Sequence, residues 1–281
     1  MKSDVYLIIK MSNYRQIILV IVSVLAALTL VACGATSPRV TPTPENTPLP
    51  TATPECHQSG TTKTDQVVFS ENGEAHGFLV YLPPCYAEYI GSAYPVLYWT
   101  SAGGQGVIDL ADSLIRQGDT PSFIYIMVDI SPVKGFGADE QIVDDVVPYV
   151  DSHYRTQADR LHRSITGFSH GAAIAARAAF RPPYIFGRVA LLSGGIADGE
   201  QQKFTDWILA MPLDLRPTVL VDVSEQDGVI VLTHHFTDLL DKLKFPYTYI
   251  LDPGNHHTES SDSHFPDYVK WLMSAPPGTS R

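Results

Sequence analysis

A serine held between two glycines is the feature of this 281-residue sequence that most directly suggests chemistry. The segment Gly167-Phe168-Ser169-His170-Gly171 forms a G-x-S-x-G pattern, with the strand-like run 161–165 before it and an alanine-rich helical run after it. This order predicts a nucleophile elbow, a strained strand-to-helix turn that exposes the serine oxygen. Glycine at both flanks would remove a steric clash in that turn. The alternative is a glycine-rich turn in which Ser169 only caps the helix.

Two further residue types must lie near Ser169 if it is a nucleophile. A serine hydroxyl needs a base within hydrogen-bond reach, and the base needs a carboxylate that orients it. After an elbow of this kind the acid comes next in the chain and the histidine follows it. Asp227, in the loop after the penultimate strand-like run, is the expected acid, with Glu225 as the alternative. His256, after the last strand-like run, is the expected base, with His257 as the alternative.

Other ionisable residues in the same regions are expected to have lesser roles. Asp222 lies within a strand-like run and is expected to be structural, and His264 is a weaker candidate for the base. His170 precedes the acid in the chain, so its side chain is expected at most to line the pocket. Two groups would be alternatives for a metal site: His234 with His235, and His256 with His257, Asp262 and His264. Their spacing does not match a helical H-x-x-x-H ligand pair, so we expect no metal site. Catalysis by a serine with a histidine base requires no organic cofactor either, and we expect none.

The predicted elements that must position these residues alternate between strand and helix. Strands are expected at 66–70, 76–82, 95–100, 123–128, 161–167, 188–192, 218–223 and 247–251, and helices at 108–116, 140–154, 171–180, 201–211, 229–243 and 265–273. This alternation predicts an α/β fold with a mostly parallel sheet and helices on both faces. The first two strands alternate in part between apolar and polar residues, which predicts an antiparallel hairpin leading into the sheet. An α/β-hydrolase fold in one domain at 58–276, followed by a tail at 277–281, satisfies all of these expectations.

The N-terminal residues have the composition of an export signal. Residues 1–33 contain basic residues, an apolar run and the segment Leu30-Val31-Ala32-Cys33, which resembles a bacterial lipobox. We therefore expect a lipoprotein-type signal peptide with Cys33 as the lipidated residue and a membrane-anchored, exported protein. An ordinary signal peptide or an uncleaved anchor is the alternative. Residues 34–57 are rich in proline and threonine and are expected to form an extended linker.

Two cysteines remain beyond the lipobox, Cys56 and Cys85. Disulfides persist in the oxidising compartments that exported proteins reach, so we expect these two residues to pair, with two free thiols as the alternative. The formal net charge of −11 argues against nucleic acid and strongly anionic polymers as partners.

Several motifs resemble the esterase D-like family of α/β-hydrolases, which includes S-formylglutathione hydrolases, feruloyl esterases, enterochelin esterases and mycolyltransferases. The resemblance extends from about Phe78 to Leu272. Besides the elbow, it rests on Tyr81-Leu82-Pro83-Pro84-Cys85-Tyr86, Tyr94-Pro95-Val96-Leu97-Tyr98, Asp145-Val146-Val147-Pro148-Tyr149-Val150 and Tyr154-Arg155-Thr156. It implies that Ser169 is the nucleophile, Asp227 the acid and His256 the base, as the chain order also indicates.

One segment departs from the pattern of this family. The family usually has a His-Gly pair before a glycine-rich turn, where this chain has Trp99-Thr100-Ser101-Ala102-Gly103-Gly104. The backbone there should supply one N–H group of the oxyanion hole, which we expect from Ala102, and His170 N–H should supply the other. A hydroxyl of Thr100 or Ser101 could compensate for the altered turn.

These observations predict a serine esterase that hydrolyses carboxylic or thio esters through an acyl-enzyme. The expected substrate is a small-molecule or glycan-linked ester. We expect the cleft that binds it to have no long lid, with loops 131–139 and 194–200 as candidate walls. An acyltransferase with the same triad and a non-catalytic binding lipoprotein on a hydrolase fold are the alternatives.

Overall fold

A computed structural model describes residues 56–101, 105–129, 137–256 and 258–275, and the side chains of 258–263 are not part of this description. The predicted signal peptide with Cys33, nearly all of the predicted linker and the predicted tail at 277–281 lie outside the described residues. Within the described part of the chain, no helix has both the length and the apolar character that a membrane span requires.

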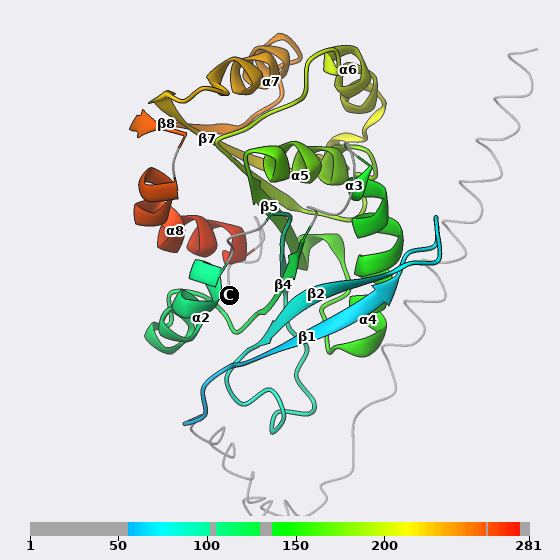
Figure 1. Ribbon diagram of the computed structural model, residues 1–281, viewed down its shortest axis with the longest axis vertical. Helices are drawn as coiled ribbons and strands as arrows, with labels where there is room; N and C mark the ends of the chain where they lie inside the picture. Colours follow the sequence, from blue (N-terminus) through cyan, green and yellow to red (C-terminus); the bar gives the residue numbers. More distant parts are fainter. Residues whose placement is uncertain (1–55, 102–104, 130–136, 257, 276–281) are drawn as a thin grey trace, which may run out of the picture. The chain divides into compact units, whose positions relative to one another are not determined.

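The described strands form one mixed sheet in the order β1-β2-β4-β3-β5-β6-β7-β8 (Figure 1). The strands are β1 (Thr61–Val68), β2 (Ala75–Leu82), β3 (Val96–Trp99), β4 (Ile124–Val128), β5 (Arg163–Phe168), β6 (Arg188–Leu192), β7 (Thr218–Gln226) and β8 (Thr248–Asn255). β1 pairs with β2 and β2 pairs with β4 in antiparallel fashion, and the remaining neighbours are parallel. The predicted mostly parallel sheet with an N-terminal antiparallel hairpin is therefore confirmed.

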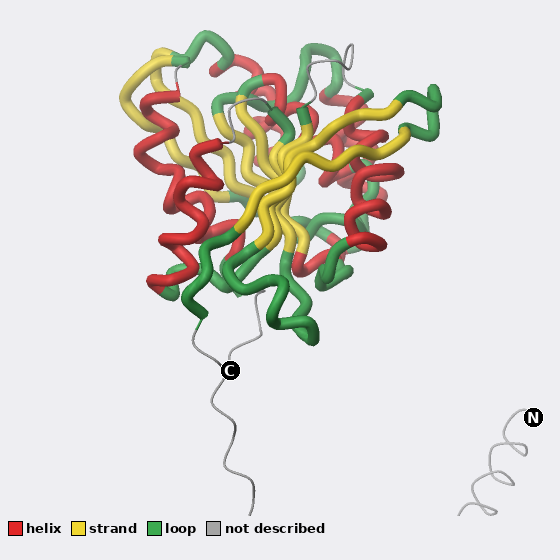
Figure 2. Tube along the Cα trace, turned by 60° about the horizontal axis from the view of Figure 1, so that its bottom comes forward, coloured by secondary structure: helices red, strands yellow, loops and turns green. Residues whose placement is uncertain are grey.

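Helices cover both faces of this twisted sheet (Figure 2). They are α2 (Gln105–Gln117), α3 (Ala138–Gln141), α4 (Val147–His153), α5 (His170–Phe180), α6 (Gln201–Ala210), α7 (Ile230–Lys242) and α8 (Thr258–Met273). One apolar core joins the sheet to helices α3 to α7, and a second core on the other face joins it to α2 and α8. The strand, helix, strand order of the sequence thus produces three layers, as expected.

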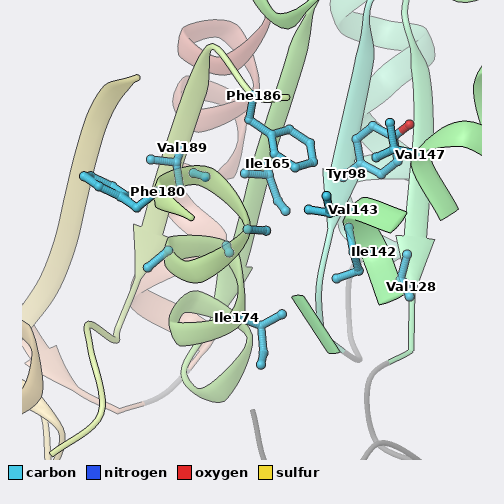
Figure 3. Close-up of a cluster of buried hydrophobic side chains, with 14 of the residues drawn as sticks. Tyr98, Val128, Ile142, Val143, Val147, Ile165, Ile174, Phe180, Phe186 and Val189 are labelled. Atoms are coloured by element: carbon cyan, nitrogen blue, oxygen red, sulfur yellow. The ribbon is translucent and has the colours of Figure 1, made fainter. Parts of the chain in front are cut away.

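The main core lies between the central strands and α5. Figure 3 shows Tyr98, Ile165 and Val189 of β3, β5 and β6 in one apolar cluster with Ile174 and Phe180 of α5. All six alanines of α5 are buried, and five of them have no exposed surface: Ala172, Ala175, Ala176, Ala178 and Ala179. Because their side chains are small, α5 can lie close to the sheet and hold the turn before it in place.

Two differences from the predicted element bounds have physical causes. β7 and β8 continue beyond the predicted ends, because their polar final residues pair with each other, as Ser224 with Asp252 and Gln226 with Asn255 across a register shift. The predicted helix 140–154 contains a π-helical turn at Ile142–Val146. Pro148 follows this turn and cannot donate the backbone hydrogen bond that a continuous α-helix would need there.

The predicted disulfide between Cys56 and Cys85 is present. It ties the first described residue of the chain to the buried segment that follows β2. Removing it by Cys56→Ser with Cys85→Ser is expected to lower the free energy of unfolding by roughly 3–4 kcal/mol, because the unfolded chain regains the freedom of a loop of about thirty residues. Urea unfolding monitored by circular dichroism measures this effect. Equal stability of the double variant and the oxidised wild type would contradict it.

Candidate active site

Ser169 lies in the turn between β5 and α5 in a backbone conformation that side chains rarely adopt, with φ 54° and ψ −118°. A Cβ atom on Gly167 would lie 2.3 Å from Thr100 Oγ1 and 2.5 Å from the carbonyl carbon of Gly171. A Cβ atom on Gly171 would lie 2.6 Å from the carbonyl oxygen of Thr100. Both glycines are therefore required by the close packing of this turn. Ser169 is the residue before α5, but its side chain makes no capping hydrogen bond.

The hydroxyl of Ser169 instead faces His256, and His256 faces Asp227. Ser169 Oγ lies 3.0 Å from His256 Nε2, and His256 Nδ1 lies 2.8 Å from Asp227 Oδ1. A carboxylate only accepts hydrogen bonds, so Nδ1 carries the proton and Nε2 of the neutral ring can accept from the serine. Each of the three residues immediately follows a parallel strand, β5, β7 or β8. The carboxyl ends of these strands lie at one edge of the sheet, which brings the three side chains together.

Asp227 is held by the backbone of the chain that follows it. Its side chain is fully buried, and Oδ1 also accepts a 2.8 Å hydrogen bond from the N–H of Val229. The other oxygen, Oδ2, has no hydrogen-bond partner among the described residues. One carboxylate oxygen thus accepts hydrogen bonds from both the histidine and the turn before α7. The bond from the turn fixes the carboxylate, and the carboxylate in turn sets the position of the histidine ring. The sequence offered no sign of this backbone donor.

Phe168, the variable residue of the elbow before Ser169, packs against the histidine. Its ring centroid lies 5.0 Å from that of His256 at an interplanar angle of 32°. The His256 side chain is about one third exposed, at 34%. Phe168 therefore covers part of the ring and leaves the rest exposed to solvent. Sequence reasoning missed this contact, because the pattern G-x-S-x-G assigns no role to its second residue.

The segment that departs from the resembled family binds the elbow. Thr100 Oγ1 donates a 2.7 Å hydrogen bond to the Gly171 carbonyl, and Ser101 Oγ accepts a 3.2 Å hydrogen bond from Phe168 N–H. Thr100 is fully buried, and its hydroxyl stabilises the turn through this hydrogen bond. His170 is the first residue of α5, where backbone N–H groups and the helix dipole favour negative charge. Ala102, the other expected donor, lies outside the described residues.

The remaining candidates do not contact Ser169 in the described part of the chain. Glu225 lies in β7 and is exposed, and His257 is not described. The other histidines have partners elsewhere: His264 with Asp252 at 3.3 Å, His235 with Asp198 at 3.2 Å and His234 with the hydroxyl of Tyr249 at 3.4 Å. Among the described residues, no cluster of three or more His, Cys, Asp or Glu side chains is arranged to hold a metal ion.

Asp222 is buried within β7, in line with a structural role. Burial raises its pKa to about 6, and the charge of Asp252 adds to the increase while His264 opposes it. A carboxyl group whose pKa rises on folding stabilises the fold in its protonated form. Its contribution is complete below about pH 4 and is lost as the pH rises through about 6.

Asp222→Asn is therefore expected to be more stable than the wild type at pH 8 by about 1–3 kcal/mol, with the difference disappearing towards pH 4. The variant keeps a neutral group of the same shape at every pH and so avoids burying a charge. Thermal unfolding of both proteins between pH 4 and 8 measures the effect, with Asp238→Asn on the exposed face of α7 as the control. A difference that does not change with pH would contradict the prediction.

Comparison with known proteins shows that part of this chain is similar to esterases. Residues 70–203 match the model of the family described as "Putative esterase". The matched residues include Ser169 but neither Asp227 nor His256. An endo-1,4-beta-xylanase/feruloyl esterase of Xylanibacter ruminicola is 30% identical over 164 residues, which are 49% of this chain and 22% of that protein. The chain thus spans about a fifth of the length of that curated relative.

Solved esterase structures have the same fold as this chain. A ferulic acid esterase matches with a TM-score of 0.67 at 19% identity, over 77% of this chain and 98% of its own. A ferulic acid esterase from the anaerobic fungus Anaeromyces mucronatus matches with a TM-score of 0.64 at 16% identity, over 76% of this chain and 91% of its own. An S-formylglutathione hydrolase from Staphylococcus aureus matches with a TM-score of 0.60 at 17% identity, over 77% of this chain and 98% of its own. The predicted α/β-hydrolase fold and the resemblance to esterase D-like proteins are confirmed.

Proposed function

We propose that this protein is a serine esterase that hydrolyses carboxylic or thio esters through an acyl-enzyme. The observation that carries the proposal is the continuous line of hydrogen bonds from Asp227 through His256 to Ser169. The esterase family of residues 70–203 and the feruloyl esterase relative support a carboxylic ester hydrolase. The relative is named for a polysaccharide-degrading enzyme, which supports a small-molecule or glycan-linked ester as the substrate.

In the first half of the proposed mechanism, His256 Nε2 takes the hydroxyl proton while Ser169 Oγ attacks the ester carbonyl carbon. The new C–O bond moves an electron pair onto the carbonyl oxygen, and the N–H groups of His170 and Ala102 hold this oxyanion. Asp227 stabilises the imidazolium that forms. The oxyanion then collapses, the bond to the alcohol breaks, and His256 gives its proton to the departing alcohol.

In the second half, water takes the place of the alcohol. His256 removes a proton from the water as the water oxygen attacks the acyl carbon. The bond between the acyl carbon and Ser169 Oγ then breaks, His256 returns the proton to Ser169 Oγ, and the carboxylic acid leaves. Neither half requires a metal or an organic cofactor. If an alcohol or a sugar hydroxyl replaces the water, the same steps give an acyltransferase, and analysis of products formed with added acceptors distinguishes the two reactions.

Labelling with a fluorophosphonate probe tests the activated serine directly. The wild type should react covalently at Ser169, and Ser169→Ala should not react, whereas Ser113→Ala on the exposed surface of α2 should react like the wild type. Equal labelling of the wild type and Ser169→Ala would exclude an activated Ser169. Turnover of p-nitrophenyl esters that is lost in Ser169→Ala and His256→Ala would exclude the alternative of a non-catalytic binding protein.

We also propose that the protein is exported and lipid-anchored through Cys33. The lipobox-like segment and the disulfide, which is typical of oxidising compartments, support this location. Growth of a bacterial expression host with a labelled fatty acid should label the wild type but not Cys33→Ser. Equal labelling of the two would contradict the anchor.

A further inference from the structure

A cavity of about 200 Å³ lies beside the proposed nucleophile. Ser169 and His170 form one side of it, and Ala173 lies one turn further along α5. The loop 194–197 after β6 and the start of α7 with Leu232 complete the described lining. One candidate wall predicted from the sequence, the loop 194–200, therefore does contribute to a cavity at the site. The other, 131–139, falls mostly outside the described residues.

Two glycines place backbone, not flexible side chains, at the wall of this cavity. A Cβ atom on Gly194 would lie 2.6 Å from the carbonyl oxygen of Ser169, and one on Gly195 would lie 2.3 Å from the carbonyl oxygen of Leu232. Thr233 Oγ1 of α7 also donates a 3.1 Å hydrogen bond to the Gly194 carbonyl. The loop is thus packed directly against both the elbow and α7. Its close contacts set the width of the cavity before any substrate binds.

The lining of the cavity is apolar apart from the residues of the elbow. Among its described lining residues, only Ser169 and His170 have side chains that can form hydrogen bonds; the others are Gly, Ala, Val, Leu or Ile. Away from these two residues, a hydroxyl group that enters the cavity loses its hydrogen bonds to water and gains no side-chain partner among the described lining residues. The cavity therefore favours an apolar group over a hydroxylated group of the same shape.

The volume sets the size of that group. An apolar cavity of about 150 Å³ can hold benzene, and one water occupies about 30 Å³ in the liquid. A cavity of about 200 Å³ therefore accommodates one six-membered ring, or an alkyl chain of about six carbons. A decyl chain or a fused ring system would extend beyond it.

The position of His256 indicates which part of an ester enters the cavity. His256 gives its proton to the departing alcohol, so that alcohol must lie on the His256 side of Ser169. His256 is not among the described residues that line the cavity, whereas His170, which begins α5, is. The cavity thus lies on the side of the serine away from the proton donor. The acyl group, which stays bound to Ser169 when the alcohol leaves, is the part that can occupy it.

We propose that this cavity is the acyl-binding pocket and that it selects short apolar acyl groups, namely an alkyl chain of about six carbons or one unsubstituted ring, over hydroxylated aromatic acyl groups. This inference rests on the proposed esterase function. It specifies the acyl half of the substrate, while the alcohol half is left to the open side at His256.

A series of p-nitrophenyl esters tests the size limit. The value of kcat/KM should rise from acetyl to hexanoyl and fall again at decanoyl. In a second comparison, the benzoyl ester should exceed the 4-hydroxybenzoyl ester by about tenfold or more, after each rate is divided by the rate of alkaline hydrolysis of the same ester. A flat chain-length profile together with equal normalised rates for the two aromatic esters would overturn the inference.

Variants of two neighbouring residues on α7 locate the acyl group. Leu232 lines the cavity, whereas Val231 is 58% exposed. Leu232→Ala should enlarge the pocket and raise the decanoyl-to-butyryl ratio of kcat/KM by about tenfold, and Ala173→Leu should lower the hexanoyl-to-acetyl ratio by a similar factor. Val231→Ala is the matched control and should leave both ratios as in the wild type.

The outcomes separate the inference from the proposed function. Turnover with both ratios unchanged in Leu232→Ala and Ala173→Leu would place the acyl group elsewhere and leave the esterase function intact. A wild type that neither hydrolyses any ester of the series nor reacts with the fluorophosphonate probe would overturn the proposed function, and the inference with it.

Discussion

Replacement of Ser169 by glycine is expected to abolish ester hydrolysis and at the same time to raise the melting temperature. Loss of the nucleophile should lower kcat by about 10⁴–10⁶-fold, the range that removal of a triad serine produces. The gain in stability follows from the backbone, because φ 54° and ψ −118° are strained for any residue with a Cβ atom. Removing the Cβ atom should relieve about 1–3 kcal/mol of strain in the folded state. Glycine also makes the unfolded chain more flexible, which lowers the free energy of unfolding by about 0.5–1 kcal/mol, so the net effect should be a gain in stability.

Ser169→Ala is the matched control for this experiment. Alanine removes the hydroxyl and retains the Cβ atom, so it should lose activity to the same extent without the gain in stability. A net gain of about 1 kcal/mol corresponds to a shift of roughly 2–4 °C in a domain of this size, which differential scanning calorimetry resolves. A melting temperature of the glycine variant at or below that of the alanine variant would contradict the prediction. It would mean that the backbone conformation of Ser169 does not lower the stability of the wild type.

Replacement of Asp227 by alanine is expected to lower kcat by about 10³–10⁴-fold while KM changes little. The side chain is fully buried and Oδ1 contacts both His256 Nδ1 and Val229 N–H, so its loss removes the group that orients the ring and stabilises its charged form. Asp227→Asn separates these two contributions. Its carbonyl oxygen can still accept both hydrogen bonds, although it carries no charge, so it should lose less activity than the alanine variant.

Glu225 provides the control, because it was the alternative acid and lies nearby in the chain. Its side chain is exposed on β7, so Glu225→Ala should retain the kcat of the wild type. Circular dichroism and thermal unfolding of all three variants would separate loss of chemistry from loss of the fold. Loss of activity in Glu225→Ala with retention in Asp227→Ala would reverse the assignment of the acid.

Much of the sheet was predictable because its signals are local. β6 occupies Arg188–Leu192, as predicted, since a short apolar run shows a buried parallel strand directly in the sequence. The ends of β7 and β8 were not predictable in this way. Their last residues are polar, and they are strands because each pairs with the other, which no single segment reveals. The spacing of apolar residues also did not predict the π-helical turn before Pro148. The proline itself is a local sign that the helix cannot be regular there.

Chain order alone made Ser169, Asp227 and His256 the leading residues, because an elbow followed by an acid and a histidine restricts the choice to two loops. Order could not decide between residues one or two positions apart, such as Asp227 and Glu225. The side chains of such neighbouring residues point in different directions from the backbone. Which of them points into the site depends on where the strand ends. Because β7 continues to Gln226, Glu225 remains on the strand and exposed, while Asp227 turns into the site.

The serine elbow is thus a property of the sequence, since glycine at both flanks is a local steric requirement of the turn. What surrounds the elbow belongs to the tertiary structure. Thr100, which follows β3, donates a hydrogen bond to the turn. Phe168 covers part of the ring of His256, and Val229 N–H positions Asp227. These contacts join segments that are distant in the chain or depend on the direction of one side chain, so no pattern of spacing records them. They arise only when the parallel strands end at a common edge.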